Sequence, residues 1–317
     1  DLNWGMFPDD IITATDLARR RAQSNWPAHI ASATAKNQKK RIIEMSSVLG
    51  TSMHIGASVQ STDPEVLANI KRTNIALEAI VAMAKSAEKT NTTTFSEIIL
   101  CLPGDTPDKH FKSVYDLIDS GIQDMRTFQF ILLPGTEGAS QKDRARFEYQ
   151  TRFRVLPRCY GSYPLYDDVL DIAEIHEVCI GNSSMSIGDY QDCRAFNLTL
   201  AIFNNGNIFD ECIALATVMG LKKSSLIEKI HDIVKTTSGE IGALYDRFKE
   251  DEERNFWETE QEVLEFLTVG NGFDAYLNGE YGSNQIYKYR TDAANELFGE
   301  ISKIVIMALE ILIKDAG

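Results

Sequence analysis

The pattern of hydrophobic and polar positions changes character about halfway along the chain. In the first half, short apolar runs typical of buried strands alternate with amphipathic segments typical of helices. The expected strands lie near residues 3, 31, 56, 98 and 129, and each is followed by an expected helix. Regular alternation of this kind predicts parallel strands joined by right-handed crossover connections.

The clearest of these β-turn-α units is the stretch GASVQSTDPEVLANIKR, which starts at Gly56. On the strand expected over 55–59, alternation places Ser58 and Gln60 on one face. Asp63 is a natural N-cap and Pro64 suits the first helical position. Polar side chains therefore stand at the carboxyl end of a strand, which is where α/β proteins bind ligands.

The second half of the chain is expected to be mostly helical. The expected helices cover 167–176, 187–204, 206–219, 222–237, 239–250, 255–268 and 292–314. The segment 160–164 is expected to be a loop, and 176–180 an isolated strand. We therefore divide the chain into a partial β/α barrel over 1–165 and a helical C-terminal domain over 166–317.

Composition narrows the classes of function. The chain has 317 residues, of which 44% are hydrophobic and 25% charged, as in a globular protein with a sizeable core. Its net charge of −14 argues against a nucleic-acid partner, because general nucleic-acid binding needs a basic surface. The longest apolar runs are too short to span a membrane, and the start of the chain has no signal-peptide pattern.

Five cysteines are spread widely through the sequence, with no spacing typical of metal ligands. They are Cys101, Cys159, Cys179, Cys193 and Cys212. An odd number in a large acidic chain predicts reduced thiols and a cytoplasmic location. Each is most simply a small buried hydrophobic residue.

Three linked motifs carry a resemblance to a known family. SVQSTDPEVLANIKR is followed by EIILCLPGDT and then by FILLPGT. This order resembles the C-terminal half of the barrel of radical S-adenosylmethionine (radical SAM) enzymes, and the match covers about residues 1–165. Together with NWGMF and RVLPRCYGSYP, the pattern most resembles the radical SAM enzymes that carry a cobalamin-binding domain.

The resemblance implies a partial parallel β/α (TIM-like) barrel, followed by the mostly helical domain. It implies S-adenosylmethionine and a [4Fe–4S] cluster as cofactors, with cobalamin as a further one. The implied activity is reductive cleavage of S-adenosylmethionine to a 5′-deoxyadenosyl radical. With cobalamin, the outcome would be methyl transfer to an unreactive carbon of an unidentified small-molecule substrate, although ring rearrangement also occurs in that group.

Four residues of the matching motifs are candidates for cofactor binding. Gln60 and Arg72 match a glutamine and an arginine that contact S-adenosylmethionine in members similar to oxygen-independent coproporphyrinogen oxidase. Glu97 matches an acidic residue that contacts the ribose, and Ser58 shares the face of Gln60. Each of these residues also has a simpler explanation. Gln60 could only cap a turn, and Arg72 could be a solvated residue at the end of a helix. Glu97 could be a carboxylate at the start of the strand that pairs with a lysine or an arginine.

Two further candidates lie at the ends of later strands. Ile99 falls where the family places an apolar residue beside the adenine, and Cys101 stands where a glycine is usual. Gly135 would let the backbone approach a flat ligand closely, although a plain turn explains it equally well.

The remaining candidates lie on the first two strands. Asn3 and Gly5 align with a strand end that often reads Gly-Gly-Glu, whose backbone carbonyls bind the cofactor's amino group. Thr34 and Ser32 are the candidates on the next strand, where ordinary alternation of a half-buried strand is the simpler explanation.

The family's cluster motif, C-x3-C-x2-C, does not occur in the sequence, so no residue of the chain is assigned to a metal. We expect the chain to be a fragment, with the first strand, the cluster loop and any cobalamin domain in a missing N-terminal segment. On this hypothesis the chain alone is inactive. The rival explanation is a protein that naturally lacks the cluster.

Two other classes of function remain open. The chain could be a non-catalytic α/β barrel whose helical domain binds a partner. It could also be a barrel lyase, but no lysine stands in the interior of an expected strand, where a Schiff base would form. A cluster of arginines over 144–158 would suit an anionic substrate, or would pair with the acidic remainder of the chain.

Overall fold

At the centre of the computed structural model lies a parallel sheet. The structure describes residues 3–30, 32, 34–35, 38–73, 77–89 and 92–316. The sheet contains β1 (Ile55–Gln60), β2 (Thr94–Leu100) and β3 (Asp124–Gln129) in the order β1-β2-β3, with both pairs parallel. The α/β class and the parallel arrangement are therefore confirmed, while the partial TIM-like barrel stays an expectation.

Two isolated parallel bridges continue the strand order towards the N-terminus. Trp4 pairs with Thr34, and Ile30 pairs with Met53, just before β1. The strand expected over 27–36 is thus represented by single bridges at Ile30 and Thr34, and its residues 31, 33 and 36 lie outside the described part of the chain. The order of the five expected segments is preserved.

The helices alternate with these strands and then follow one another in the second half. They are α1 (Asp10–Ser24), α2 (Lys39–Leu49), α3 (Pro64–Asn69), α4 (Leu77–Lys89), α5 (Pro107–Asp119), α6 (Gln141–Phe147), α7 (Ile187–Phe203), α8 (Asp210–Val218), α9 (Lys223–Thr236), α10 (Glu240–Arg254), α11 (Glu260–Thr268), α12 (Gly272–Leu277), α13 (Gln285–Glu296) and α14 (Phe298–Ala316). Short 3-10 turns cover η1 (Gly50–Ser52), η2 (Glu137–Ala139) and η3 (Asn205–Asn207).

Local sequence explains where the helices next to the sheet begin. The carboxylate of Asp63 accepts hydrogen bonds from the backbone of Glu65 and Val66, both at 3.0 Å, so α3 starts at Pro64 as predicted. The hydroxyl of Thr106 caps α5 in the same way. Both helices therefore start directly after a strand and lead the chain away from its carboxyl end.

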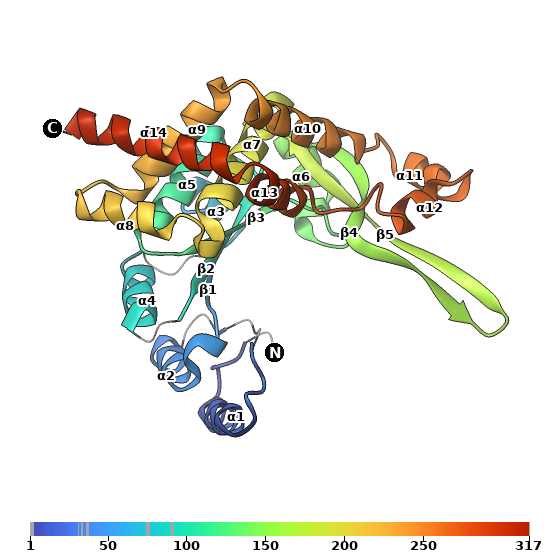
Figure 1. The fold of residues 1–317 in the computed structure, drawn as a ribbon. Coiled ribbons are helices and arrows are strands. Elements are labelled where there is room, and N and C mark those ends of the chain that lie inside the picture. The colour runs from blue at the N-terminus through green and yellow to red at the C-terminus, as the bar shows by residue number, and fades with distance from the viewer. Residues whose placement is uncertain are drawn as a thin grey trace.

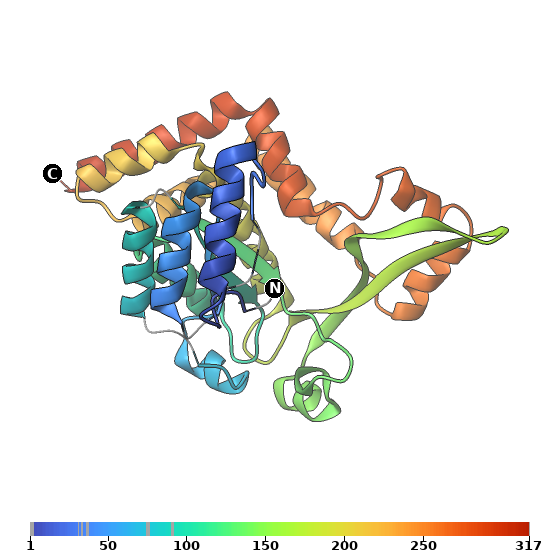
Figure 2. The same ribbon diagram turned by 90° about the horizontal axis from the view of Figure 1, so that it is seen from below.

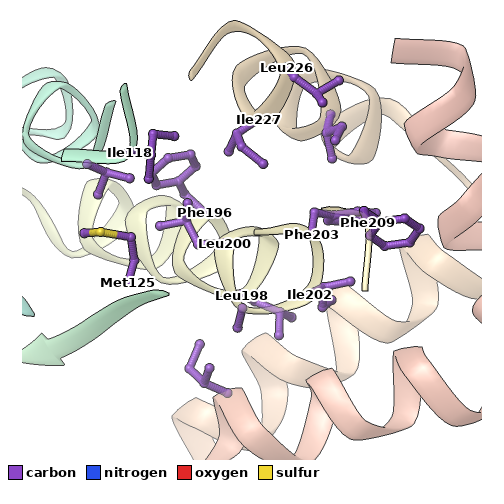
Figure 3. Close-up of a cluster of buried hydrophobic side chains, with 14 of the residues drawn as sticks. Ile118, Met125, Phe196, Leu198, Leu200, Ile202, Phe203, Phe209, Leu226 and Ile227 are labelled. Atoms are coloured by element: carbon purple, nitrogen blue, oxygen red, sulfur yellow. The ribbon is translucent and has the colours of Figure 1, made fainter. Parts of the chain in front are cut away.

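One face of the sheet is buried against helices. Side chains of β2 are buried at alternate positions from Thr94 to Leu100. Val59, Ile98 and Met125 belong to a large apolar core that also contains residues of α5, α7 and α9. Figure 3 shows how the side chains of α7, among them Phe196 and Leu200, fill the space between the sheet residue Met125 and the neighbouring helices.

The segment after α6 corrects two predictions. It forms a long antiparallel hairpin of β4 (Gln150–Leu165) and β5 (Asp168–Gly181). The expected loop over 160–164 and the expected helix over 167–176 are therefore wrong, and the strand expected over 176–180 is the end of β5 rather than an isolated strand. The hairpin projects away from the sheet, and its base lies beside α11 and α12 (Figures 1 and 2).

The rest of the second half is helical, as predicted. The expected helix over 292–314 is two helices, α13 and α14, and the one expected over 255–268 begins later, at Glu260. The helices α7, α9, α13 and α14 share one core with the sheet, while the division at residue 165 falls in the hairpin and stays a prediction. Every helix in the described part of the chain is too short or too polar to cross a membrane.

Candidate functional site

The face of the sheet that points away from α5 and α7 carries a row of polar side chains. Strand register places Ser58 of β1 opposite Glu97 of β2, and Glu97 opposite Arg126 of β3. These three residues, which we call the polar row, lie at positions that alternate with the buried residues of each strand. Three separate segments of sequence thus bring one hydroxyl, one carboxylate and one guanidinium side by side.

Glu97 is the centre of the polar row. Its Oε2 accepts a hydrogen bond from the hydroxyl of Ser58 at 2.5 Å. Its Oε1 lies 3.9 Å from Nη1 of Arg126, which is an ion pair but too long for a direct hydrogen bond. Because 28% of the Glu97 side chain is exposed, Oε1 can accept a hydrogen bond from a ligand. The alternative of a paired carboxylate is also correct, with Arg126 as the partner.

Apolar side chains flank the polar row on the same face. Phe95 and Ile99 of β2 are half-buried, and Phe128 of β3 is exposed. Register pairs Ile99 with Phe128, and the guanidinium of Arg126 lies 3.7 Å from the centre of the Phe95 ring. A flat ligand would find apolar surface next to a carboxylate, which is the combination that a nucleoside needs.

Gln60 ends β1 in a strained conformation. Its φ of +63° is in the left-handed region, and the strand register shifts between Ser58 and Gln60. Because of this shift Gln60 pairs with Ile98 of the buried face, so the expectation that Ser58 and Gln60 share one face is wrong. The side-chain Oε1 of Gln60 is buried and has no hydrogen-bond partner. A buried acceptor without a partner is costly, so this atom lacks a donor that a ligand could supply.

Cys101 occupies the equivalent position directly after β2. Its φ of +67° is a conformation that favours glycine, the residue usual there in the family. The buried thiol lies 3.7 Å from the sulfur of Cys179, and the hydrogen bond with that thiol, together with burial, raises the pKa of Cys101. The side chain therefore points into the core rather than toward the open face.

Arg72 and Gly135 lie outside the strands that carry the polar row. Arg72 is exposed just after α3, and Gly135 is exposed with a φ of +80° in the turn after β3. An ion pair between Lys71 and Glu137 joins these two segments. A role for either residue in cofactor binding stays a prediction.

The candidates on the N-terminal segments are engaged within the protein. The carbonyl of Gly5 accepts a hydrogen bond from Arg41 at 3.0 Å, and the hydroxyl of Thr34 donates to the carbonyl of Gly56 at 3.4 Å. Asn3 is exposed beside the Trp4 bridge. The structure thus brings Ser58, Glu97 and Ile99 together on the open face of the sheet and places Gln60 at the end of β1 opposite Ile98. The cofactor contacts of Asn3, Gly5 and Thr34 stay predictions.

Sequence reasoning missed Arg126. A strand near residue 129 was predicted, over 125–133, and β3 covers only its first part. Its alternation places Arg126 and Phe128 on one face. The available signal was an arginine on one strand and a glutamate, Glu97, on the neighbouring strand, which together predict an ion pair on the open face. Within the described ranges, no group of three histidine, cysteine or acidic side chains is arranged to hold a metal ion.

The fold defines an α/β protein, and the polar row marks a candidate ligand-binding face at its parallel strands. No family model matches the sequence. Two curated proteins do match: a 2-(S-pantetheinyl)-carbapenam-3-carboxylate methyltransferase from Streptantibioticus cattleyicolor is 30% identical over 214 residues. The cobalamin-dependent radical SAM methyltransferase TokK from Streptomyces tokunonensis is 27% identical over 214 residues.

Each match covers 65% of this chain, and the chain spans only 30% of the length of each relative. A solved structure, the radical SAM methyltransferase TsrM from Kitasatospora setae, covers 38% of this chain and 24% of its own, with 12% identity and a TM-score of 0.28. The sequence is thus similar to two methyltransferases, one of which is named as a cobalamin-dependent radical SAM enzyme, and this confirms the resemblance predicted from the three motifs.

Proposed function

We propose that the open face of the sheet binds S-adenosylmethionine and that the enzyme is a radical SAM methyltransferase. The observation that carries this proposal is the polar row with the apolar side chains of Ile99 and Phe128 beside it, in a chain whose relatives are methyltransferases. The relatives also favour an enzyme over a non-catalytic barrel. Because the chain spans only 30% of each relative, the activity of the whole enzyme is part of the proposal.

The residues at this face fit the nucleoside part of the cofactor. Glu97 offers a carboxylate oxygen to the ribose hydroxyls, and Ser58 fixes the orientation of that carboxylate. Gln60 offers a buried acceptor that lacks a donor. Ile99 and Phe128 offer apolar surface to the adenine. Arg72 would pair with the methionine carboxylate if α3 ends close to the bound cofactor.

S-adenosylmethionine supplies the methyl group and, when cleaved reductively, the carbon radical of this chemistry. The part of the protein described above would bind the cofactor, orient it and hold its ribose. In the described residues no donor set fits a [4Fe–4S] cluster, so we assign none of them to it. Use of cobalamin, as in TokK, is proposed for the whole enzyme, with methyl transfer to an unreactive carbon of a small molecule.

Binding of S-adenosylhomocysteine, an unreactive analogue, tests this proposal by calorimetric titration. Glu97→Gln keeps the shape of the side chain but removes its charge. We expect the dissociation constant to rise about tenfold, because a charge-assisted hydrogen bond contributes roughly 1.5 kcal/mol or more. Glu300→Gln is the matched control, since Glu300 pairs with Lys303 on α14, away from the sheet face. Equal affinities of the two variants would contradict the assignment.

A further inference from the structure

A second concave site lies along the free edge of β3. It is a cavity of about 400 Å³ between β3, the hairpin and the helices α7, α10 and α13, and its lining includes Arg154, Arg194 and Gln285. We call it the arginine cavity. Arg126 and Phe128 line it too, so it adjoins the open face that carries the polar row.

Arg154 of β4 is a cation without an acidic partner in direct contact. Its Nε donates to Nε2 of His176 at 2.8 Å, and its Nη2 donates to Oε1 of Gln129. Both partners are neutral acceptors, because burial lowers the pKa of His176 to about 4. In the described part of the chain, no carboxylate oxygen lies within 4.0 Å of Arg154. The guanidinium therefore keeps N–H groups and a positive charge available to a ligand.

The other charges of the cavity leave an excess of positive charge. Arg194 and Glu252 form a buried ion pair with two hydrogen bonds of 2.6 and 2.7 Å, and so largely neutralise each other. Arg290 also lines the cavity, and its Nη2 donates to the carbonyl of Asn205 at 3.2 Å. Four arginines thus face two carboxylates, Asp124 and Glu252, in a chain whose overall charge is −14.

Two buried amide side chains in the lining have an unpartnered polar atom. Gln285 is 7% exposed and its Oε1 has no hydrogen-bond partner, while Asn197 is 1% exposed and its Nδ2 has none. The other end of the Asn197 amide contacts Nε2 of His110 at 3.0 Å. Buried polar atoms are normally paired, so a polar ligand could supply the missing partners of this acceptor and this donor.

We propose that the arginine cavity binds the carboxylate of a small-molecule substrate, with Arg154 as its principal ligand. A guanidinium presents a planar fork that matches the two oxygens of a carboxylate. Gln285 and Asn197 would bind a neutral polar group of the same molecule. The assignment of the cavity to the substrate rests on the proposed function. The binding of a carboxylate anion in the cavity does not depend on it.

A carboxylate suits the cavity better than a phosphate group. Glu252 and Asp124 lie in its wall and offset part of the positive charge of the arginines. A doubly charged anion costs more to remove from water than a singly charged one, and the remaining positive charge compensates that cost less completely. The excess positive charge is also modest, because the ion pair with Glu252 engages Arg194. Acetate and inorganic phosphate therefore serve as the two probes.

The test follows the side-chain Nε–Hε signals of arginine by NMR while the 317-residue chain is titrated with sodium acetate or inorganic phosphate at constant ionic strength. We expect acetate to shift the Arg154 signal and to bind more tightly than phosphate. In Arg154→Gln, measured from the remaining cavity signals, the acetate affinity should fall about tenfold. Arg152→Gln, two residues away on the same strand and paired with Glu258, is the matched control.

An equal loss of acetate affinity in the Arg152 and Arg154 variants would indicate unspecific attraction and would overturn the proposal. Tighter binding of phosphate than of acetate, or an unshifted Arg154 signal, would also overturn it. If Arg154→Gln does not fold, Arg154→Lys keeps the charge and should weaken acetate binding less. S-adenosylhomocysteine binding without acetate binding would refute this inference alone. Acetate binding without S-adenosylhomocysteine binding would refute the proposed function instead.

Discussion

At the scale of single residues, the strongest sign of function is a residue whose conformation is unfavourable for its type. Gln60 adopts a left-handed backbone at φ +63° and buries an acceptor without a partner. A left-handed backbone costs roughly 1–2 kcal/mol for a residue other than glycine. Strain of this kind is found most often at binding sites, where a ligand completes the contacts.

Replacing Gln60 by glycine should separate stability from binding. Glycine relieves the strain of roughly 1–2 kcal/mol. It also gives the unfolded chain more freedom, which costs roughly 0.5–1 kcal/mol, so we expect the free energy of unfolding to rise by at most about 1.5 kcal/mol. Affinity for S-adenosylhomocysteine should fall about fivefold, because a neutral hydrogen bond contributes about 1 kcal/mol. Urea unfolding and calorimetric titration measure the two quantities.

Asn25→Gly is the control for this substitution. Asn25 has a φ of +55° at the end of α1, where it caps the helix through its backbone. The exchange relieves the same kind of strain away from the sheet, and it should leave the affinity unchanged. Normal affinity of the Gln60→Gly variant would show that the amide does not contact the ligand.

At the scale of elements, the sequence predicts a helix or strand correctly where its own residues determine its bounds. The Asp63 cap and Pro64 fix the start of α3, and the alternation from Thr94 to Leu100 gives β2 and its open face. Three candidates, Ser58, Gln60 and Glu97, follow from these local patterns. The proximity of Ser58 and Glu97 follows from the parallel register, which the β-α alternation predicts. The register shift after Ser58, which pairs Gln60 with Ile98, has no local signal in the sequence.

The hairpin was missed because its sequence contains residues that normally interrupt strands. Pro157 lies where the register shifts between Val155 and Tyr160, and Pro164 faces Val169 near the exposed tip. Both positions tolerate proline, since one is irregular and the other lies in an isolated two-stranded sheet. The arginine cavity was equally hidden, because its side chains come from segments that only the folded chain brings together.

At the scale of the whole molecule, buried titratable groups predict how stability depends on pH. Burial lowers the pKa of His110, His176 and His231 to about 4. Burial raises the pKa of Asp105 to about 7, although two backbone N–H groups oppose that shift. These four groups titrate at a different pH in the folded chain than in the unfolded one, so folding and protonation are linked.

The three histidines and Asp105 change the pH dependence of stability in opposite directions. Between pH 6.5 and 4 the three histidines bind protons only in the unfolded chain, so their contribution to stability is present above pH 6.5 and lost as the pH falls. Over most of that range Asp105 holds a proton only in the folded chain, which favours folding. About two more protons are therefore bound on unfolding, and stability should fall by up to ~2.7 kcal/mol per pH unit.

Urea unfolding of the chain at a series of pH values between 6.5 and 4.5 measures this slope. His231→Asn removes one of the three histidines and should reduce the slope by about one proton, or ~1.4 kcal/mol per pH unit. His29→Asn is the control, because His29 is not buried. A stability that rises as the pH falls through this range would contradict the assignment of the buried histidines as neutral.

The central claim is that the open face of the sheet binds the nucleoside of S-adenosylmethionine. Isoleucine methyl NMR during titration with S-adenosylhomocysteine tests it most directly, because Ile99 is on that face, its neighbour Ile98 is 1% exposed in the core, and Ile286 lines the arginine cavity. The account predicts a saturable shift of the Ile99 methyl signal that exceeds the shifts of Ile98 and Ile286. An unchanged Ile99 signal, or a dominant shift at Ile286, would contradict it.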